Sequence, residues 1–114
     1  MYTKLDEEGG NEDDNVLDID LRNIDDDIFE VDFTWLGHLF SADISGMNTW
    51  KNVLCVNVDG CKFFKGDIAT IESLPEGLKV FSCNDCGGVE GDIVVMAKFK
   101  KLKSLGLRET KVKG

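Results

Sequence analysis

The chain of 114 residues is long enough for one folded domain, and its hydrophobic content of 42% is ordinary for such a domain. Its formal net charge of −9 is uneven, with a net −12 in residues 1–50 and +3 in residues 51–114. Because the acidic half repels phosphate, this distribution argues against nucleic acid as a partner. An acidic surface instead favours a partner protein with a basic segment, or it simply keeps the molecule soluble.

Residues 1–15 are rich in Asp, Glu and Gly and contain no apolar run. This composition predicts an acidic tail that is disordered or loosely packed. A secretory signal requires an apolar segment of about seven or more residues, and no stretch of the chain approaches the length of a membrane span. We therefore expect no membrane association and, by default, a cytoplasmic protein whose cysteines remain reduced.

The folded domain is expected over residues 16–114 and is expected to begin with a cap. Between Val16 and Ile24 apolar and polar residues alternate, which predicts a strand with one buried face. Asp25–Asp27 interrupts the alternation, and a second strand is expected from Ile28. The 12 residues from Val16 to Ile28 are too few for a parallel crossover. Residues 16–27 are therefore predicted to form the first strand and turn of an antiparallel β-hairpin that caps the domain.

Four stretches after this cap repeat one spacing of apolar residues every 24 to 25 residues. The repeats start near residues 28, 53, 78 and 102, and the last is incomplete. The four sets of matching positions are Ile28, Val31, Phe33 and Leu36; Val53, Val56, Val58 and Cys61; Leu78, Phe81, Cys83 and Cys86; and Leu102, Leu105, Leu107 and Thr110. A periodic core pattern of this kind is typical of a stacked solenoid rather than of a globule closed around one centre.

The second half of each unit is predicted to be a short helical return. In the first three units a small residue precedes an Asp-Ile pair, and further apolar residues recur every three positions. The pairs are Asp43-Ile44, Asp67-Ile68 and Asp92-Ile93. Aspartate is a preferred helix N-cap, and a small residue before it allows a sharp turn. We therefore interpret these aspartates as structural caps rather than as metal ligands or catalytic acids.

The repeat spacing resembles that of the leucine-rich repeat family, in which Asn or Cys occupies the ninth column of each repeat. Cys61 and Cys86 stand in that column, and Thr110 is a substitute that can also hydrogen-bond to the backbone. Leu36 does not fit the column, so the first unit is degenerate. The Gly-Asp-Ile steps of the second and third units are similar to the Gly-x-Ile step of the plant-type subclass.

The resemblance implies an α/β fold of a particular kind. We expect a leucine-rich repeat solenoid with a parallel concave β-sheet, short helical or 3-10 returns on the convex face, and the N-terminal hairpin as its cap. Members of the family mostly bind proteins through the concave sheet, and very few are enzymes in the repeat itself. The function that the resemblance implies is therefore that of a protein–protein interaction module.

Four cysteines raise the question of a metal or redox site. The spacing from Cys55 to Cys61 and from Cys83 to Cys86 departs from the two short spacings usual in zinc modules. The repeat register places the last three in the core and Cys55 on the solvent side of the sheet, so the four thiols are not expected to converge. His38 has no serine, cysteine or carboxylate partner at a defined spacing. We predict no metal site, no cofactor and no enzymatic activity.

The strand residues that alternate with the core columns are expected to line a polar concave face that is acidic toward its N-terminal end. Trp50 aligns with core residues, whereas Trp35 falls in an outward column, where it is either an interface anchor or packs against residues 1–15. The predicted partner-binding residues are Glu30, Asp32, Thr34, Trp35, Asn57, Asp59, Ser82, Asn84 and Asp85. A solvated face without a partner remains the alternative.

The basic last unit leaves a second function class open. Residues 98–114 carry seven Lys or Arg against one Glu, and lysines on a strand edge discourage pairing. These lysines could blunt a terminus, or they could meet the acidic end of another copy in an end-to-end self-association. The alternative function is accordingly a structural or self-associating fragment of a longer repeat protein that has no ligand of its own.

Overall fold

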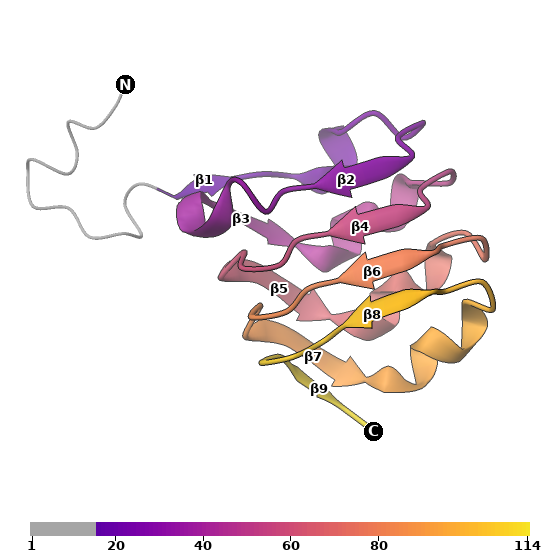
Figure 1. Ribbon diagram of the computed structural model, residues 1–114. Coiled ribbons are helices and arrows are strands. Elements are labelled where there is room, and N and C mark those ends of the chain that lie inside the picture. The colour runs from indigo at the N-terminus through magenta and orange to yellow at the C-terminus, as the bar shows by residue number, and fades with distance from the viewer. Residues whose placement is uncertain (1–15) are drawn as a thin grey trace, which may run out of the picture.

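The protein folds into two parallel β-sheets joined by short 3-10 helices, in a computed structural model that describes residues 16–114 (Figure 1). The four-stranded sheet contains, in spatial order, β2 (Glu30–Asp32), β4 (Cys55–Asn57), β6 (Val80–Ser82) and β8 (Ser104–Gly106). The five-stranded sheet contains β1 (Leu17–Asp18), β3 (Phe40–Asp43), β5 (Phe63–Asp67), β7 (Gly88–Asp92) and β9 (Lys111–Lys113). The predicted α/β class with parallel strands is confirmed, but the repeat columns predicted only the first of the two sheets.

Short 3-10 helices follow the strands, and three of them begin at the predicted Asp-Ile pairs. They are η2 (Leu21–Asn23), η3 (Gly37–Leu39), η4 (Ile44–Thr49), η5 (Ile68–Ser73) and η6 (Ile93–Lys98). The carboxylates of Asp43, Asp67 and Asp92 each accept a hydrogen bond of 2.9 Å from the backbone N–H two residues later. Their role as helix N-caps is therefore confirmed. None of the described helices has the length and apolar character needed to cross a membrane.

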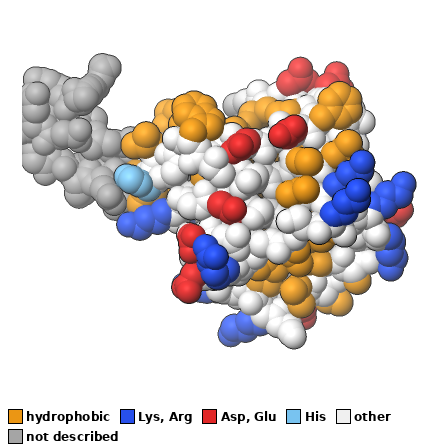
Figure 2. Space-filling model, in the orientation of Figure 1, with side chains coloured by type: hydrophobic (Ala, Val, Ile, Leu, Met, Phe, Trp, Pro, Cys, Tyr) orange, Lys and Arg blue, Asp and Glu red, His pale blue; other side chains and the backbone are white. Residues whose placement is uncertain are grey.

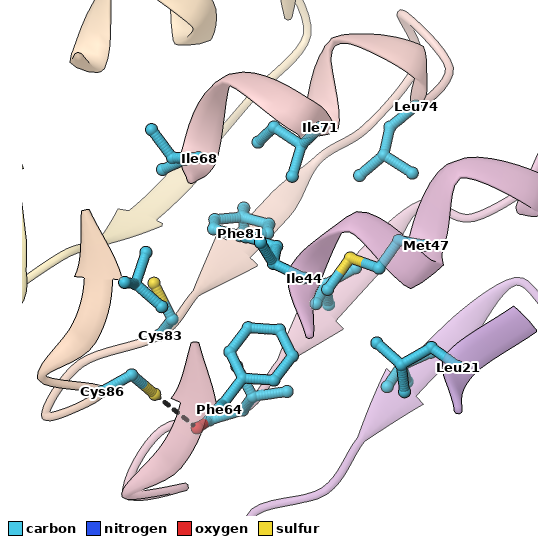
Figure 3. Packing of buried hydrophobic residues seen from close by; sticks show 14 of the residues in the cluster. Leu21, Ile44, Met47, Phe64, Ile68, Ile71, Leu74, Phe81, Cys83 and Cys86 are labelled. Carbon is cyan, nitrogen blue, oxygen red and sulfur yellow. Dashed lines mark hydrogen bonds between the residues drawn. The ribbon is translucent and has the colours of Figure 1, made fainter. Parts of the chain in front are cut away.

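Side chains from both sheets and from the helices meet in one core (Figure 3). Phe64 of β5 and Phe81 of β6 are fully buried, as are Ile71 and Leu74 on the helical side. Figure 3 shows Ile68 and Ile71 of η5, together with Leu74 just after it, along one side of the core, with Phe81 below them. Each repeat unit forms one layer of the structure, and equivalent apolar side chains of successive layers stack on one another. Burial is therefore most complete in the middle layers, which have a neighbour on both sides.

The predicted antiparallel hairpin cap over residues 16–27 is wrong. β1 does not pair with β2; it pairs in parallel with β3, and Leu17 lies opposite Phe40. Asp20 and Leu21 are equivalent to the Asp-Ile pairs of the later units. The Asp20 carboxylate accepts a hydrogen bond from the Arg22 N–H at 3.0 Å, and Leu21 is buried at the start of η2. The long connection from β1 to its true partner satisfies the crossover length that a parallel pair needs. The predicted tail over residues 1–15 lies outside the described residues.

Close packing requires the glycines that precede two of the caps, Gly66 before Asp67 and Gly91 before Asp92. Gly66 has φ +124°, and a Cβ added there would lie 2.6 Å from Cγ2 of Ile44 and 2.9 Å from the carboxylate of Asp43 in the preceding layer. A side chain at this position would therefore clash with the N-cap below it. The glycine thus lets successive layers approach one another at the corner where strand becomes helix.

Candidate functional site

The candidate site is the solvent-facing side of the four-stranded sheet, which we call the outer sheet face (Figure 2). Two columns of side chains point out of this sheet, and strand register places their members side by side. The first column is Glu30, Cys55, Val80 and Ser104, and the second is Asp32, Asn57, Ser82 and Gly106. Glu30, Asp32 and Ser104 are exposed, whereas Ser82 is only 8% exposed.

Acidic side chains on this face concentrate around β2. Glu30 and Asp32 project from the same side of this strand, and both are exposed. The Asp32 carboxylate accepts hydrogen bonds from the Thr34 hydroxyl at 2.6 Å and the Thr34 N–H at 3.0 Å, and this lowers its pKa below the usual range. The Asp32 carboxylate is therefore held in its negatively charged form at neutral pH. The acidic N-terminal end predicted for this face is present.

Several of the predicted binding residues instead connect one layer to the next. The Asp59 carboxylate accepts a hydrogen bond from the Ser82 hydroxyl at 2.6 Å and another from the Asn84 N–H at 2.7 Å. The Asn84 side-chain oxygen accepts a hydrogen bond from the Arg108 N–H at 2.7 Å in the following layer. The side-chain oxygen of Asn57 accepts the N–H of Asp59 at 3.1 Å. These polar side chains hold the turns after the strands in register, and we call them the turn ladder: Asn57, Asp59, Ser82 and Asn84.

Trp35 stands on the turn after β2 and is 77% exposed, as its outward column predicts. Its packing against residues 1–15, the alternative left open by the sequence, lies outside the described part of the chain. Asp85 occupies the same column two layers away, where its backbone has a left-handed φ of +67°. Asp85 forms a 3.3 Å ion pair with Arg108 between two well-exposed side chains, an arrangement that contributes little to stability.

Sequence reasoning missed a second exposed aromatic side chain on this face. Phe29 immediately precedes β2 and is 63% exposed. It shares its column with Leu54, Lys79 and Lys103, and two lysines at matching positions are a signal that this column faces solvent. Phe29 and Trp35 therefore lie at the two ends of the strand that carries the acidic pair. Figure 2 shows hydrophobic side chains on both sides of the acidic ones at this end of the molecule.

The cysteines lie where the repeat register places them. Cys61, Cys83 and Cys86 are buried, and Cys55 is half-buried on the outer sheet face. The Cys61 thiol donates to the Phe33 carbonyl at 3.3 Å and the Cys86 thiol to the Val58 carbonyl at 3.2 Å, so each thiol satisfies a backbone group of the preceding layer. Burial raises the pKa of Cys61 to about 12. Hydrogen bonding to Cys86, together with burial, also raises the pKa of Cys83.

These positions limit what the thiols can do chemically. The nucleophilic and metal-binding form of cysteine is the thiolate, which the raised pKa disfavours at Cys61 and Cys83. The hydrogen bond with Cys83 lowers the pKa of Cys86, but that thiol is buried. Cys55 faces the opposite side of the sheet from the buried thiols. Within residues 16–114, the one group of ligand-type side chains that gathers within 4.8 Å is the exposed triplet Asp25–Asp27. That triplet adds to the acidic character of the β2 end.

Neither a known protein family nor a curated protein or solved structure matches the chain. The resemblance to leucine-rich repeats therefore rests on the repeat columns themselves.

Proposed function

We propose that this chain is a leucine-rich-repeat-type interaction module that binds a partner protein through its outer sheet face. The recurring spacing, the aspartate caps and the buried cysteines that hydrogen-bond to the preceding layer all support this reading. In such a module, the outer sheet face corresponds to the concave sheet of the solenoid. The partner is a protein segment that is basic and carries apolar or aromatic side chains.

The observation that carries the proposal is the composition of the β2 end of this face. Two exposed aromatic side chains, Phe29 and Trp35, flank two exposed carboxylates, Glu30 and Asp32. Exposed aromatic side chains are the commonest anchors of protein interfaces. Carboxylates beside them attract Lys and Arg, and a bound Arg can also stack on the indole of Trp35. Glu30 and Asp32 are held by a strand that is paired with β4, which lowers the entropic cost of binding at these two positions.

A display library of random peptides supplies the probe. Peptides selected on the wild-type protein are expected to be enriched in Lys and Arg and to contain an apolar residue. Their affinity is then measured by fluorescence anisotropy for the wild type and for the variants Trp35→Ala and Glu30→Lys. No hydrogen bond within the described chain involves the Glu30 side chain, so its substitution changes the charge of the face without removing a structural contact.

The matched control is Glu90→Lys, which makes the same charge change on an exposed position of β7 in the other sheet. Each outer-face variant is expected to weaken binding by roughly 1 to 2 kcal/mol, the range of a moderate interface residue, while the control leaves affinity within a factor of about two. Selected peptides without basic enrichment would contradict the proposed partner class. Equal affinity of the outer-face variants and the wild type would contradict the assignment of the face.

A further inference from the structure

The inward-facing apolar side chains of the five-stranded sheet are buried on its middle strands and exposed to solvent on its two edge strands. Phe40, Phe64 and Val89 are each 0% exposed. Leu17, on the edge strand β1, is 62% exposed, and Val112, on the opposite edge strand β9, is only partly buried. By strand alternation both edge residues point to the inner side of the sheet, where Leu17 lies opposite Phe40 of β3 and Val112 opposite Gly91 of β7. Within residues 16–114, neither has a strand neighbour on its other side. Covering both would remove this apolar surface from water.

The backbones of these two edge strands are complementary as well. Within residues 16–114, β1 pairs only with β3 and β9 pairs only with β7. Every pair in this sheet is parallel. A second copy shifted along the sheet therefore brings its β1 beside β9 of the first copy with both strands running in the same direction. The unpaired N–H and C=O groups of the two edges can then bond as those inside the sheet do.

Side-chain alternation in the two edge strands gives this pairing a matching charge pattern. The Asp18 carboxylate lies on the outer side of β1, where it accepts a hydrogen bond from the Ser41 hydroxyl at 2.9 Å. In β9 the half-buried Val112 lies between Lys111 and Lys113, which are exposed on the outer side. Pairing of the two edges therefore places Leu17 near Val112 on the inner side. On the outer side it places Asp18 near the two lysines.

The surrounding charge selects this pairing over the alternatives. Residues 16–39 carry seven acidic side chains and one basic side chain, a net −6 with His38 counted as neutral. Residues 98–114 carry seven basic side chains and one acidic, a net +6. Two β9 edges repel each other, as do two β1 edges, whereas an acidic end and a basic end attract.

We propose that copies of this protein associate head to tail, with β9 of one copy pairing in parallel with β1 of the next so that the five-stranded sheets become continuous. This surface is separate from the outer sheet face. The contact joins two different patches, so it leaves a free edge at each end and generates chains rather than closed dimers. Opposite charges directly across a strand pair stabilise it, so association is expected to weaken as ionic strength rises.

Light scattering of the full chain, over a concentration series at low and high ionic strength, measures this association. The average mass is expected to rise with concentration at low ionic strength and to fall toward the monomer at high ionic strength. Two charge reversals, Asp18→Lys and the pair Lys111→Asp/Lys113→Asp, are each expected to weaken self-association roughly tenfold, because each places like charges at the joint. An equimolar mixture of the two variants is expected to restore association, because every joint between unlike copies again pairs opposite charges.

The control variant is Lys51→Asp/Lys79→Asp, which makes the same charge change as the lysine pair at two exposed positions outside the five-stranded sheet and should leave association unchanged. Circular dichroism melts verify that every variant is folded. A constant monomer mass at all concentrations and low ionic strength would overturn the proposal. So would a mixture of the two charge reversals that scatters no more strongly than each variant alone.

Discussion

Replacement of Asp59 by Ala is expected to destabilise the protein although Asp59 is not a core residue. Its half-buried carboxylate accepts hydrogen bonds from the Ser82 hydroxyl and the Asn84 N–H, at 2.6 and 2.7 Å. Ser82 is only 8% exposed, so water can hardly replace the carboxylate as hydrogen-bond acceptor of its hydroxyl group in the variant. Hydrogen bonds to a charged acceptor contribute about 1.5 to 3 kcal/mol each when they are buried. Allowing for partial exposure, the free energy of unfolding should fall by about 2 to 3 kcal/mol.

Thermal melts followed by circular dichroism, together with urea titrations, measure this loss. For a domain of this size the loss corresponds to a fall in Tm of about 10 to 15 °C. Asp59→Asn keeps one acceptor oxygen and should lose about half as much. Glu30→Ala, which removes an exposed carboxylate from the same sheet face, should change stability by less than about 0.5 kcal/mol. Equal Tm values for Asp59→Ala and Glu30→Ala would refute the structural role of the turn ladder.

Three further predictions concern the corners and the core. Gly66→Ala should lower the free energy of unfolding, measured by urea titration, by at least about 1 kcal/mol. The reason is that Gly66 has φ +124° and that an added Cβ would lie 2.6 Å from Ile44. A stabilised variant would contradict the packing of that corner. Cys55 alone among the four thiols should react promptly with a disulfide reagent in the native protein, and prompt reaction of more than one thiol per chain would contradict the buried cysteine row. The pKa of Asp43 is lowered chiefly by the hydrogen bond from the Ser45 N–H, so the stability it contributes is present above the pKa of the unfolded chain and is lost as pH falls through the folded pKa. Urea titrations at pH values from neutral to acid should show a smaller acid-dependent loss for Asp43→Asn than for the wild type, and an equal loss would contradict the N-cap assignment.

The parts of the fold that could be predicted from sequence are those that each layer repeats. Asp43, Asp67 and Asp92 are local caps, because the bonded N–H lies only two residues away. Their role therefore follows from residue type and spacing alone. The buried positions of Cys61 and Cys86 follow equally from the ninth column of the repeat, in which both residues stand. Parallel strands follow from the repeat length, which leaves room for a crossover.

The parts that could not be predicted depend on contacts between layers. Asp59 reaches Ser82 and Asn84 across 23 and 25 residues, and no local pattern reveals which polar column bonds to the next layer and which stays free to bind. The predicted antiparallel cap is wrong because the strand before Ile28 does not pair with the strand after it: β1 pairs in parallel with β3. The Asp20-Leu21 pair matches the later Asp-Ile pairs and marks residues 16–27 as part of a regular unit.

The candidate face was predictable in position but only partly in composition. The outward columns follow from strand alternation, so Glu30, Asp32 and Trp35 could be placed there from sequence. Phe29 was missed because it precedes the strand, and an apolar residue in that place reads as part of the core. Lys79 and Lys103, which occupy the same column as Phe29, indicate more clearly that this column faces solvent. The result is a smaller candidate site, centred on β2, than the nine residues that the sequence predicts.

Chemical-shift mapping tests whether the β2 end of the outer sheet face binds a basic protein segment. A selected Lys- and Arg-rich peptide is titrated into the isotopically labelled protein, and backbone amide and indole N–H signals are followed. Signals of Phe29 through Asp32 and of the Trp35 indole are expected to shift, and the signal of the buried Trp50 indole is expected to stay in place. Shifts confined to the five-stranded sheet or to the β8 and β9 end would contradict it.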